Sequence, residues 1–167
     1  VDDTDVCEVV QRMRRRRGGD DRLLAYRNGR TWHTVQATDV NDYLAGIFKG
    51  EVTAKDFRTW HATVIAAIAL ASNPSPGETK TARRKVIREA VAEVADYLGN
   101  TPAVARGSYV DPRVLDLYED GTTIARALQR APRHPQRRQL HLEKAVLRML
   151  SRAPSSAQRS NRRKRAA

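Results

Sequence analysis

The feature that most restricts the fold is the apolar pattern that follows Thr53. Large apolar side chains recur there at spacings of three and four residues and then fill all sides of the segment: Phe57, Trp60, Val64, Ile65, Ile68 and Leu70. This spacing is typical of an α-helix, and a helix that is apolar all round is buried. Thr53 is the expected N-cap, with Asp56 three residues later in the position of a capping-box partner. The second half of this helix is therefore expected in the core.

Cap residues divide much of the remaining chain into further helices. Ser, Thr and Asp begin helices, Pro suits the first turn because it has no N–H, and Gly ends helices in the left-handed conformation. The helices expected on these signals are one from Asp3 to Arg17 before Gly18-Gly19, one from Thr38 to Gly50, one from Thr79 or Thr81 to Gly99, short ones opened by Thr101-Pro102 and by Asp111-Pro112, and a last one from Leu140 to Arg152.

A hairpin is the one β element that the sequence indicates. Asn28-Gly29 lies between the apolar runs at residues 23–26 and 31–35, and Asn-Gly in that setting is the strongest short-range hairpin signal. Residues 73–77 form an expected loop, and Gly121 and the prolines near 132–135 interrupt the helical pattern. The predicted fold is mainly α, with a small hairpin near the N-terminus.

Length and cysteine content limit the class of protein. A chain of 167 residues fits one domain with tails, and no run of about 18 apolar residues predicts a transmembrane helix. The single cysteine, Cys7, excludes an intramolecular disulfide and a cysteine-based zinc site, so a reducing cytoplasm is the expected compartment. The chain starts at Val1 without Met or a signal peptide, which we interpret as a fragment or a processed chain.

The charge favours a phosphate-bearing partner. Lys and Arg number 31 against 19 Asp and Glu, a net charge of +12, and 25 of the basic residues are Arg, whose planar fork matches phosphate. A coding bias toward Ala, Arg and Val would produce the same excess without any function. Residues 153–167 carry no acid and are expected to be a disordered basic tail, of a kind that usually screens or tethers on DNA without reading its sequence. An anionic membrane surface fits less well, since no helix pairs a basic face with a large aromatic one.

Several kinds of site find no support in the sequence. The four histidines do not share the spacing of a metal site. There is no glycine-rich phosphate loop and no nucleophile elbow. We therefore expect no metal and no nucleotide cofactor.

Two segments could carry chemistry. In the first, residues 55–60, Lys55 and Arg58 share a helix face near its N-terminal turns, where exposed N–H groups also suit a phosphate; a solvated charged face is the alternative. The second, residues 98–112, joins Asn100, a short capped helix and Tyr109. On its own, a tyrosine there would be ordinary core material.

Together the two segments resemble the C-terminal catalytic segment of type IB DNA topoisomerases, in the branch shared by bacterial and poxvirus enzymes. The shared pattern is K-D-[FL]-R-T-[WY], then G-[NH]-T-P, then Tyr nine residues after the Asn or His, here residues 55–60, 99–102 and Tyr109. The run at residues 38–44, T-D-V-N-D-Y-L, is also similar to the family. The likeness extends from about Val1 to Tyr118.

The resemblance implies a mechanism and a partner. Tyr109 would attack a phosphodiester of duplex DNA, form a 3′-phosphotyrosyl link and free a 5′-hydroxyl, without ATP or another cofactor. Arg58 and Asn100 would donate hydrogen bonds to the phosphoryl oxygens; many relatives have His in place of the Asn. Lys55 and Arg106 are the further expected DNA contacts. A monomer that acts on the nucleoid, with no membrane association, follows from the same likeness.

Two catalytic residues of the family have no match in the chain. They are a second Arg and a Lys on a β-hairpin, which protonates the leaving 5′-oxygen and in relatives lies just before the stretch that aligns with Val1. We therefore expect residues 1–152 to be the C-terminal part of the catalytic domain, with its motifs in residues 53–112. The chain alone is then expected to be nearly inactive.

Other classes of protein stay open at this stage. A tyrosine recombinase or integrase uses the same chemistry, but it usually shows H-x-x-R where this chain has Lys55, and Leu-Gly-His where it has residues 98–100 as Leu-Gly-Asn. A non-catalytic basic DNA-binding module, with Tyr109 in its core, is a second alternative. A basic RNA-associated structural protein would explain the charge but not the two ordered motifs.

Overall fold

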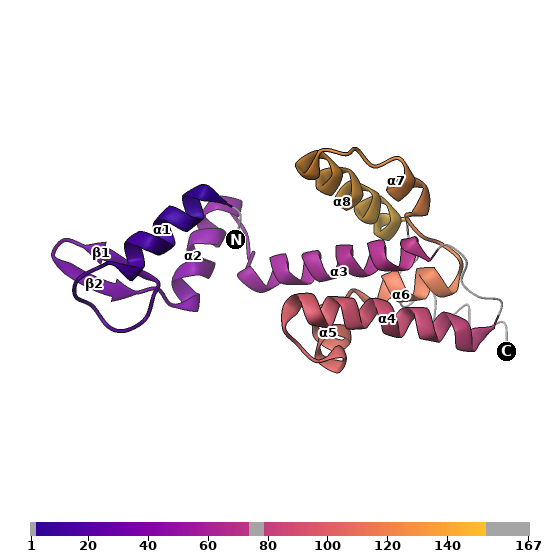
Figure 1. The fold of residues 1–167 in the computed structure, drawn as a ribbon, viewed down its shortest axis with the longest axis horizontal. Coiled ribbons are helices and arrows are strands. Elements are labelled where there is room, and N and C mark those ends of the chain that lie inside the picture. The colour runs from indigo at the N-terminus through magenta and orange to yellow at the C-terminus, as the bar shows by residue number, and fades with distance from the viewer. Residues whose placement is uncertain (1–2, 74–78, 153–167) are drawn as a thin grey trace. The chain divides into compact units, whose positions relative to one another are not determined.

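Helices make up most of the computed structural model, which describes residues 3–73 and 79–152. The order of elements along the described chain is α1 (Thr4–Arg14), β1 (Ala25–Asn28), β2 (Thr31–Thr34), α2 (Ala37–Phe48), α3 (Ala54–Ser72), α4 (Lys80–Leu98), α5 (Pro102–Ser108), α6 (Pro112–Glu119), α7 (Ala125–Gln129) and α8 (Pro135–Ser151). The predicted mainly helical fold with one small hairpin is confirmed (Figure 1). The chain divides into two compact units, Val1–Ala54 and Lys55–Ala167.

The hairpin of the N-terminal unit forms where Asn-Gly predicts it. Strands β1 and β2 pair antiparallel from Ala25 opposite Thr34 to Asn28 opposite Thr31. Gly29 in the turn has φ +59°, a left-handed conformation that a residue without a Cβ adopts at little cost. The turn residues thus set the register of the whole hairpin.

The bounds of α2 differ from the prediction at both ends. Gln36, and not Thr38, is the N-cap, because its N–H donates to the Asp39 carboxylate at 2.7 Å and so satisfies one of the amides that a helix start leaves open. The helix ends at Phe48 rather than at Gly50, since Lys49 already takes the left-handed conformation with φ 50°. Sequence reasoning favoured glycine for that role.

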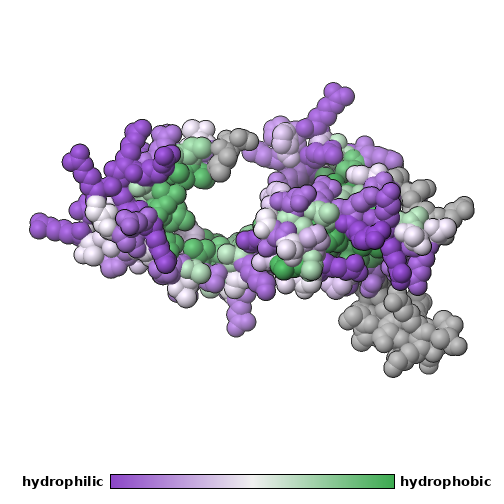
Figure 2. Space-filling model, turned by 60° about the horizontal axis from the view of Figure 1, so that its bottom comes forward, coloured by the Kyte–Doolittle hydropathy of each residue, from purple (hydrophilic) through white to green (hydrophobic). Residues whose placement is uncertain are grey.

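Polar contacts, rather than a core, hold the N-terminal unit. No described residue of this unit is buried, and several of its large apolar side chains are exposed, Tyr43 at 69%. Figure 2 shows hydrophobic residues uncovered on the surface of the molecule. The Arg16 side chain is the exception within the arginine run, with only 7% of it exposed. It donates to the carbonyls of Asp20 and Leu23, each at 2.6 Å, and lies over the Trp32 ring. Part of the arginine cluster is therefore structural.

Helix α3 is the centre of the C-terminal unit. Its second half is buried as predicted, with Ala62, Ala66 and Leu70 at no more than 1% exposed. Figure 1 shows α3 between α8 on one side and α4 and α6 on the other, and buried residues of all four helices belong to one apolar cluster. Burial of a side chain as large as Leu70 contributes about 1.5–3 kcal/mol to folding.

The C-terminal helices begin earlier than predicted. The five-residue helix α7 was not expected, and α8 begins at Pro135 instead of Leu140. Proline is tolerated there because it occupies the first turn of the helix, where its missing N–H has no partner to lose. His141 of α8 lies 3.1 Å from the Ala127 carbonyl through its Nε2 and so joins the two helices.

Some expectations fall outside what the structure describes. The expected loop at residues 73–77 lies largely in the undescribed stretch 74–78, and the basic tail of residues 153–167 lies outside the described residues. The extent of the catalytic domain, residues 1–152, stays a prediction. Among the helices described, none has the length and apolar character needed to cross a bilayer.

Tyr118 supplies a test of the core. It is fully buried, and its hydroxyl has no hydrogen-bond partner among the described residues. Burial raises the pKa of this phenol above its ordinary value of 10.0, although nearby Arg83 opposes the shift. Because an unsatisfied buried hydroxyl is costly, Tyr118→Phe is expected to leave the free energy of unfolding unchanged or raise it by up to about 1 kcal/mol at pH 7.

The same variant has a pH signature. The unfolded chain ionises Tyr118 near pH 10 before the folded chain does, so the wild type loses stability as the pH rises above that value. Tyr118→Phe lacks this loss. Urea titrations at pH 7 and pH 10.5 measure both effects, and a variant destabilised by more than 1.5 kcal/mol at pH 7 would show that the hydroxyl has a partner.

Candidate active site

The two motif segments meet at the side chains of Arg58 and Tyr109. The guanidinium carbon of Arg58 lies 5.2 Å from the centre of the Tyr109 ring, within the range of a cation–π contact. The same guanidinium donates through Nη2 to the Leu98 carbonyl at 3.3 Å. Arg58 of α3 therefore touches both the residue before Gly99 and the tyrosine that follows α5.

The end of α4 explains why an arginine lies there. Gly99 takes φ +65° and closes the helix, with its N–H and that of Asn100 donating to the carbonyls of Asp96 and Ala95 at 3.3 and 2.9 Å. The last carbonyls of a helix lack intrahelical donors and form the negative end of its dipole. The Leu98 carbonyl is one of them, so a cation is favoured beside it.

Asn100, two residues after Leu98, has an unused side-chain donor. Its side-chain nitrogen Nδ2 is buried and has no hydrogen-bond partner among the described residues. The following residues are fixed, since the Thr101 side chain accepts from the Val104 N–H at 3.3 Å and Pro102 occupies the first turn of α5. An unpaired buried amide costs about 1–3 kcal/mol, and such a group is often retained for a ligand.

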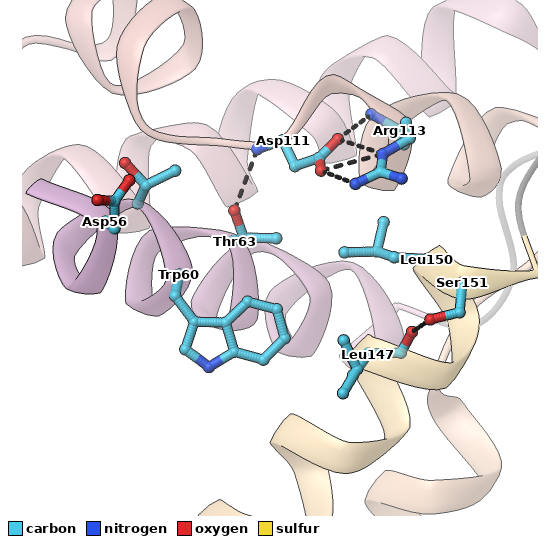
Figure 3. A pocket seen from close by; sticks show the side chains of 9 residues that line it. Asp56, Trp60, Thr63, Asp111, Arg113, Leu147, Leu150 and Ser151 are labelled. Atoms are coloured by element: carbon cyan, nitrogen blue, oxygen red, sulfur yellow. Dashed lines mark hydrogen bonds and ion pairs between the residues drawn. The ribbon is translucent and has the colours of Figure 1, made fainter. Parts of the chain in front are cut away.

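Tyr109 is held by its backbone. It forms the C-cap of α5, where its N–H donates to the Ala105 carbonyl at 3.1 Å. The hydroxyl of Thr63 donates to the Tyr109 carbonyl at 3.4 Å and accepts from the Asp111 N–H at 3.1 Å. Figure 3 shows Thr63 on α3 directly below Asp111. The tyrosine is half-buried and packs against the apolar core.

A paired carboxylate anchors the next helix. Asp111 is the N-cap of α6, accepting from the Arg113 N–H at 2.9 Å, and its carboxylate also pairs with the Arg113 guanidinium at 2.6 Å (Figure 3). Burial by itself raises the pKa of Asp111, but the hydrogen bonds from Arg113 outweigh it and hold the pKa below the ordinary 3.8. Sequence reasoning found the cap but not this pair, whose signal was the short D-P-R spacing.

The remaining predicted DNA contacts are surface cations. Lys55 near the start of α3 and Arg106 in the last turn of α5 are both exposed. Lys55 lies three residues before Arg58, and Arg106 lies three residues before Tyr109. The structure thus brings Arg58 and Tyr109 into contact, places Asn100 two residues after the Leu98 carbonyl, and leaves the other two cations on the surface.

A groove of about 290 Å³ lies beside Thr63 and is not part of this cluster. Figure 3 shows its walls, formed by residues of α3, by Asp111 and Arg113, and by the end of α8; Arg58, Asn100 and Tyr109 do not line it. In the part of the chain that the structure describes, no three His, Cys, Asp or Glu side chains gather as metal ligands would. The chemistry that this site can perform rests on a phenol, a guanidinium and an amide.

The Asp111–Arg113 pair predicts a pH dependence of stability. Because the folded pKa of Asp111 is lowered, the pair stabilises the fold above pH 4 and this contribution is lost as the pH falls through the folded pKa. Asp111→Asn keeps the capping oxygen but removes the charge, and we expect it to cost about 1 kcal/mol at pH 7 and less at pH 2.5. Urea unfolding at both pH values measures this; a cost as large at pH 2.5 as at pH 7 would contradict it.

A comparison with models of known protein families identifies the family to which the chain is similar. The family model described as eukaryotic DNA topoisomerase I, catalytic core, matches residues 3–132. The match includes Arg58, Asn100 and Tyr109 and ends before α8. No curated protein matches the chain.

Proposed function

The chain belongs to the type IB DNA topoisomerase family, enzymes that bind DNA and change its topology, and from this premise we propose that Tyr109 is the nucleophile of a strand-cleavage reaction. The observation that carries the proposal is the contact between the Arg58 guanidinium and the Tyr109 ring, 5.2 Å apart. It joins two motifs that are distant in the sequence at one point of the fold. Such a juxtaposition is what a shared phosphate would require.

The proposed step is a transesterification. The Tyr109 oxygen forms a bond to the DNA phosphorus, and the bond from phosphorus to the 5′-oxygen breaks. The phosphate then links the tyrosine oxygen to the 3′-oxygen of the cleaved strand. Rotation of the free end relaxes supercoils, and attack by the 5′-hydroxyl restores the strand. One ester replaces another, so ATP is not consumed and no cofactor is needed.

In this proposal Arg58 donates hydrogen bonds to the nonbridging phosphoryl oxygens. Negative charge grows on the two nonbridging oxygens as the tyrosine attacks, and a fixed guanidinium stabilises it. The bond to the Leu98 carbonyl uses one of the five N–H donors of the side chain. It holds the group beside the tyrosine while other donors can face a phosphate.

Asn100 supplies a neutral hydrogen bond. Its unpartnered Nδ2 supports this role, because a phosphoryl oxygen would satisfy the buried donor. An amide does not titrate, so Asn100 stabilises charge and does not move protons. Lys55 and Arg106, both exposed, are proposed to contact the DNA backbone, Lys55 as a phosphate contact near Arg58.

The finer assignment is to the bacterial and poxvirus-like branch, with this chain as the C-terminal part of the catalytic domain. It is supported by the motifs at residues 55–60 and 99–109. The second arginine and the lysine that acts as general acid are then supplied by polypeptide outside these 167 residues. A monomer on duplex DNA in the cytoplasm, associated with the nucleoid, completes the proposal. A recombinase fits less well, because Lys55 and Asn100 stand where it usually has histidines.

Covalent capture tests the nucleophile. A duplex with a 5′-bridging phosphorothiolate needs no general acid, because the thiolate leaves unaided. The wild-type chain is expected to form a denaturation-resistant adduct with it, and Tyr109→Phe to form none. Asn100→Ala is expected to slow adduct formation by about 10²–10³-fold, the usual cost of removing one donor to a developing charge. Rates are read from denaturing gels in single turnover.

Tyr97→Phe is the matched control for this experiment. Tyr97 is 62% exposed on α4 and stacks on His61, and no role in the reaction is assigned to its hydroxyl. It should form the adduct at the wild-type rate. An adduct with Tyr109→Phe, or its loss with Tyr97→Phe, would contradict the assignment of Tyr109.

An unmodified phosphodiester gives a different result. Without a general acid, cleavage by the 167-residue chain alone should be slower than by a complete site by about 10²–10⁴-fold. Plasmid relaxation by the chain should therefore be almost undetectable at equal concentration and should recover when the upstream region is added in trans. Relaxation at enzyme-like rates by the chain alone would show that its residues include the general acid.

A further inference from the structure

Thr63 is the one buried polar residue in the described part of the chain, with 2% of its surface exposed. It lies on α3 among apolar neighbours, in the half of the helix that forms the core. A buried hydroxyl is costly unless it is hydrogen-bonded, so its presence there asks for a structural reason. None of the motifs read from the sequence includes it.

The hydroxyl of Thr63 makes two bonds to one short segment. It donates to the Tyr109 carbonyl at 3.4 Å and accepts the Asp111 N–H at 3.1 Å, on the two sides of Val110. A hydroxyl has one proton to give and lone pairs to accept with, and both functions are used here. In Figure 3 the bond rises from α3 to the residue that begins α6.

The two hydrogen bonds of Thr63 hold the Tyr109 segment at a set distance from Arg58 along α3. Thr63 follows Arg58 by five positions, so the two residues are separated by about 7.5 Å of rigid helix. Tying the backbone of Tyr109 to Thr63 therefore ties the tyrosine to the helix that carries Arg58. The far side of the segment is held as well, since Asp111 is paired with Arg113.

We propose that Thr63 is a positioning residue for strand cleavage: its hydroxyl sets the register between the segment that carries Tyr109 and the helix that carries Arg58, and so holds the tyrosine beside the guanidinium. The assignment rests on the proposed function of Tyr109. Thr63 does not touch DNA or the reacting atoms. Without the bridge, residues 109–111 shift against α3, and a misplacement of about 1 Å lowers the rate of chemistry by up to about 10²-fold.

Three variants separate positioning from stability. Thr63→Val keeps the branched shape and removes both hydrogen bonds, while Thr63→Ser keeps the hydroxyl. Thr123→Val is the matched control, because the Thr123 hydroxyl also accepts a backbone N–H, that of Ala125 at 3.3 Å, but it lies before α7. Both valine variants lose a backbone hydrogen bond in the same unit. Should Thr63→Val fail to fold, Thr63→Cys, whose thiol is only a weak hydrogen-bond group, replaces it.

Two measurements are made on each variant. The first is the single-turnover rate of adduct formation on the phosphorothiolate duplex, compared with duplex affinity and with the urea midpoint. The second is the nuclear Overhauser contact between the Arg58 side chain and the Tyr109 ring in the DNA-free protein. We expect Thr63→Val to lower the rate by about 10–10²-fold with affinity unchanged and to lose the contact. Thr63→Ser should regain both, and Thr123→Val should keep both.

The proposal is overturned if Thr63→Val keeps the Arg58–Tyr109 contact. It is also overturned if Thr63→Ser is as slow as Thr63→Val, or if Thr123→Val slows the reaction equally. The two levels of inference fail differently. If Tyr109→Phe forms the adduct, or if the wild type forms none even with the upstream region added in trans, the proposed chemistry is wrong. Loss of the contact in Thr63→Val and its return in Thr63→Ser would then still show that the Thr63 hydroxyl holds the Tyr109 ring beside Arg58.

Discussion

Burial of the second half of α3 is the constraint on which the rest of the C-terminal unit depends. A helix that is apolar on all sides must be covered on all sides, and α4, α6 and α8 contribute buried residues to the cluster around it. The first turns of the same helix stay at the surface, where Lys55 and Arg58 are exposed. One element thus joins a rigid core to an exposed cation, and a charge carried by a core helix is held more firmly than one carried by a loop.

The features that the sequence predicted are those set by near neighbours. Asn28-Gly29 turns the hairpin, Gly99 ends α4, and Thr101-Pro102 begins α5, because each effect acts over a few residues of backbone. The errors in the predicted helix bounds also span only a few residues. The prediction placed the start of α2 at Thr38, although Gln36 and Asp39 form the cap, and it placed the start of α8 at Leu140, although Pro135 fits a first turn.

Interactions between distant residues could not be predicted in this way. The Thr63 hydroxyl bridges to Tyr109 and Asp111, 46 and 48 residues later, and no local pattern marks a single threonine in an apolar helix as a bridge. The role of Arg16 is similar: it lies in a basic run that suggested nucleic acid, yet it binds backbone carbonyls of its own unit. A charge count cannot tell such an arginine from one that faces a phosphate. The contact of Arg58 with Tyr109 was implied only through the resemblance of two motifs.

Hydrogen bonds to backbone groups hold Arg58 and Tyr109 of the candidate site in place, while a side-chain donor of Asn100 is unpaired. Arg58 is fixed by the Leu98 carbonyl, and Tyr109 by the Ala105 carbonyl and the Thr63 hydroxyl, whereas the side-chain nitrogen of Asn100 has no partner among the described residues. Donors that are already oriented need little rearrangement when charge develops, which is where electrostatic catalysis gains most. The described residues leave two buried polar atoms unpaired, Asn100 Nδ2 and the Tyr118 hydroxyl, and leaving either unpaired costs stability. Only Asn100 lies in a motif segment beside the contact of Arg58 with the Leu98 carbonyl in the sequence, and this supports its proposed role as a donor to an anion.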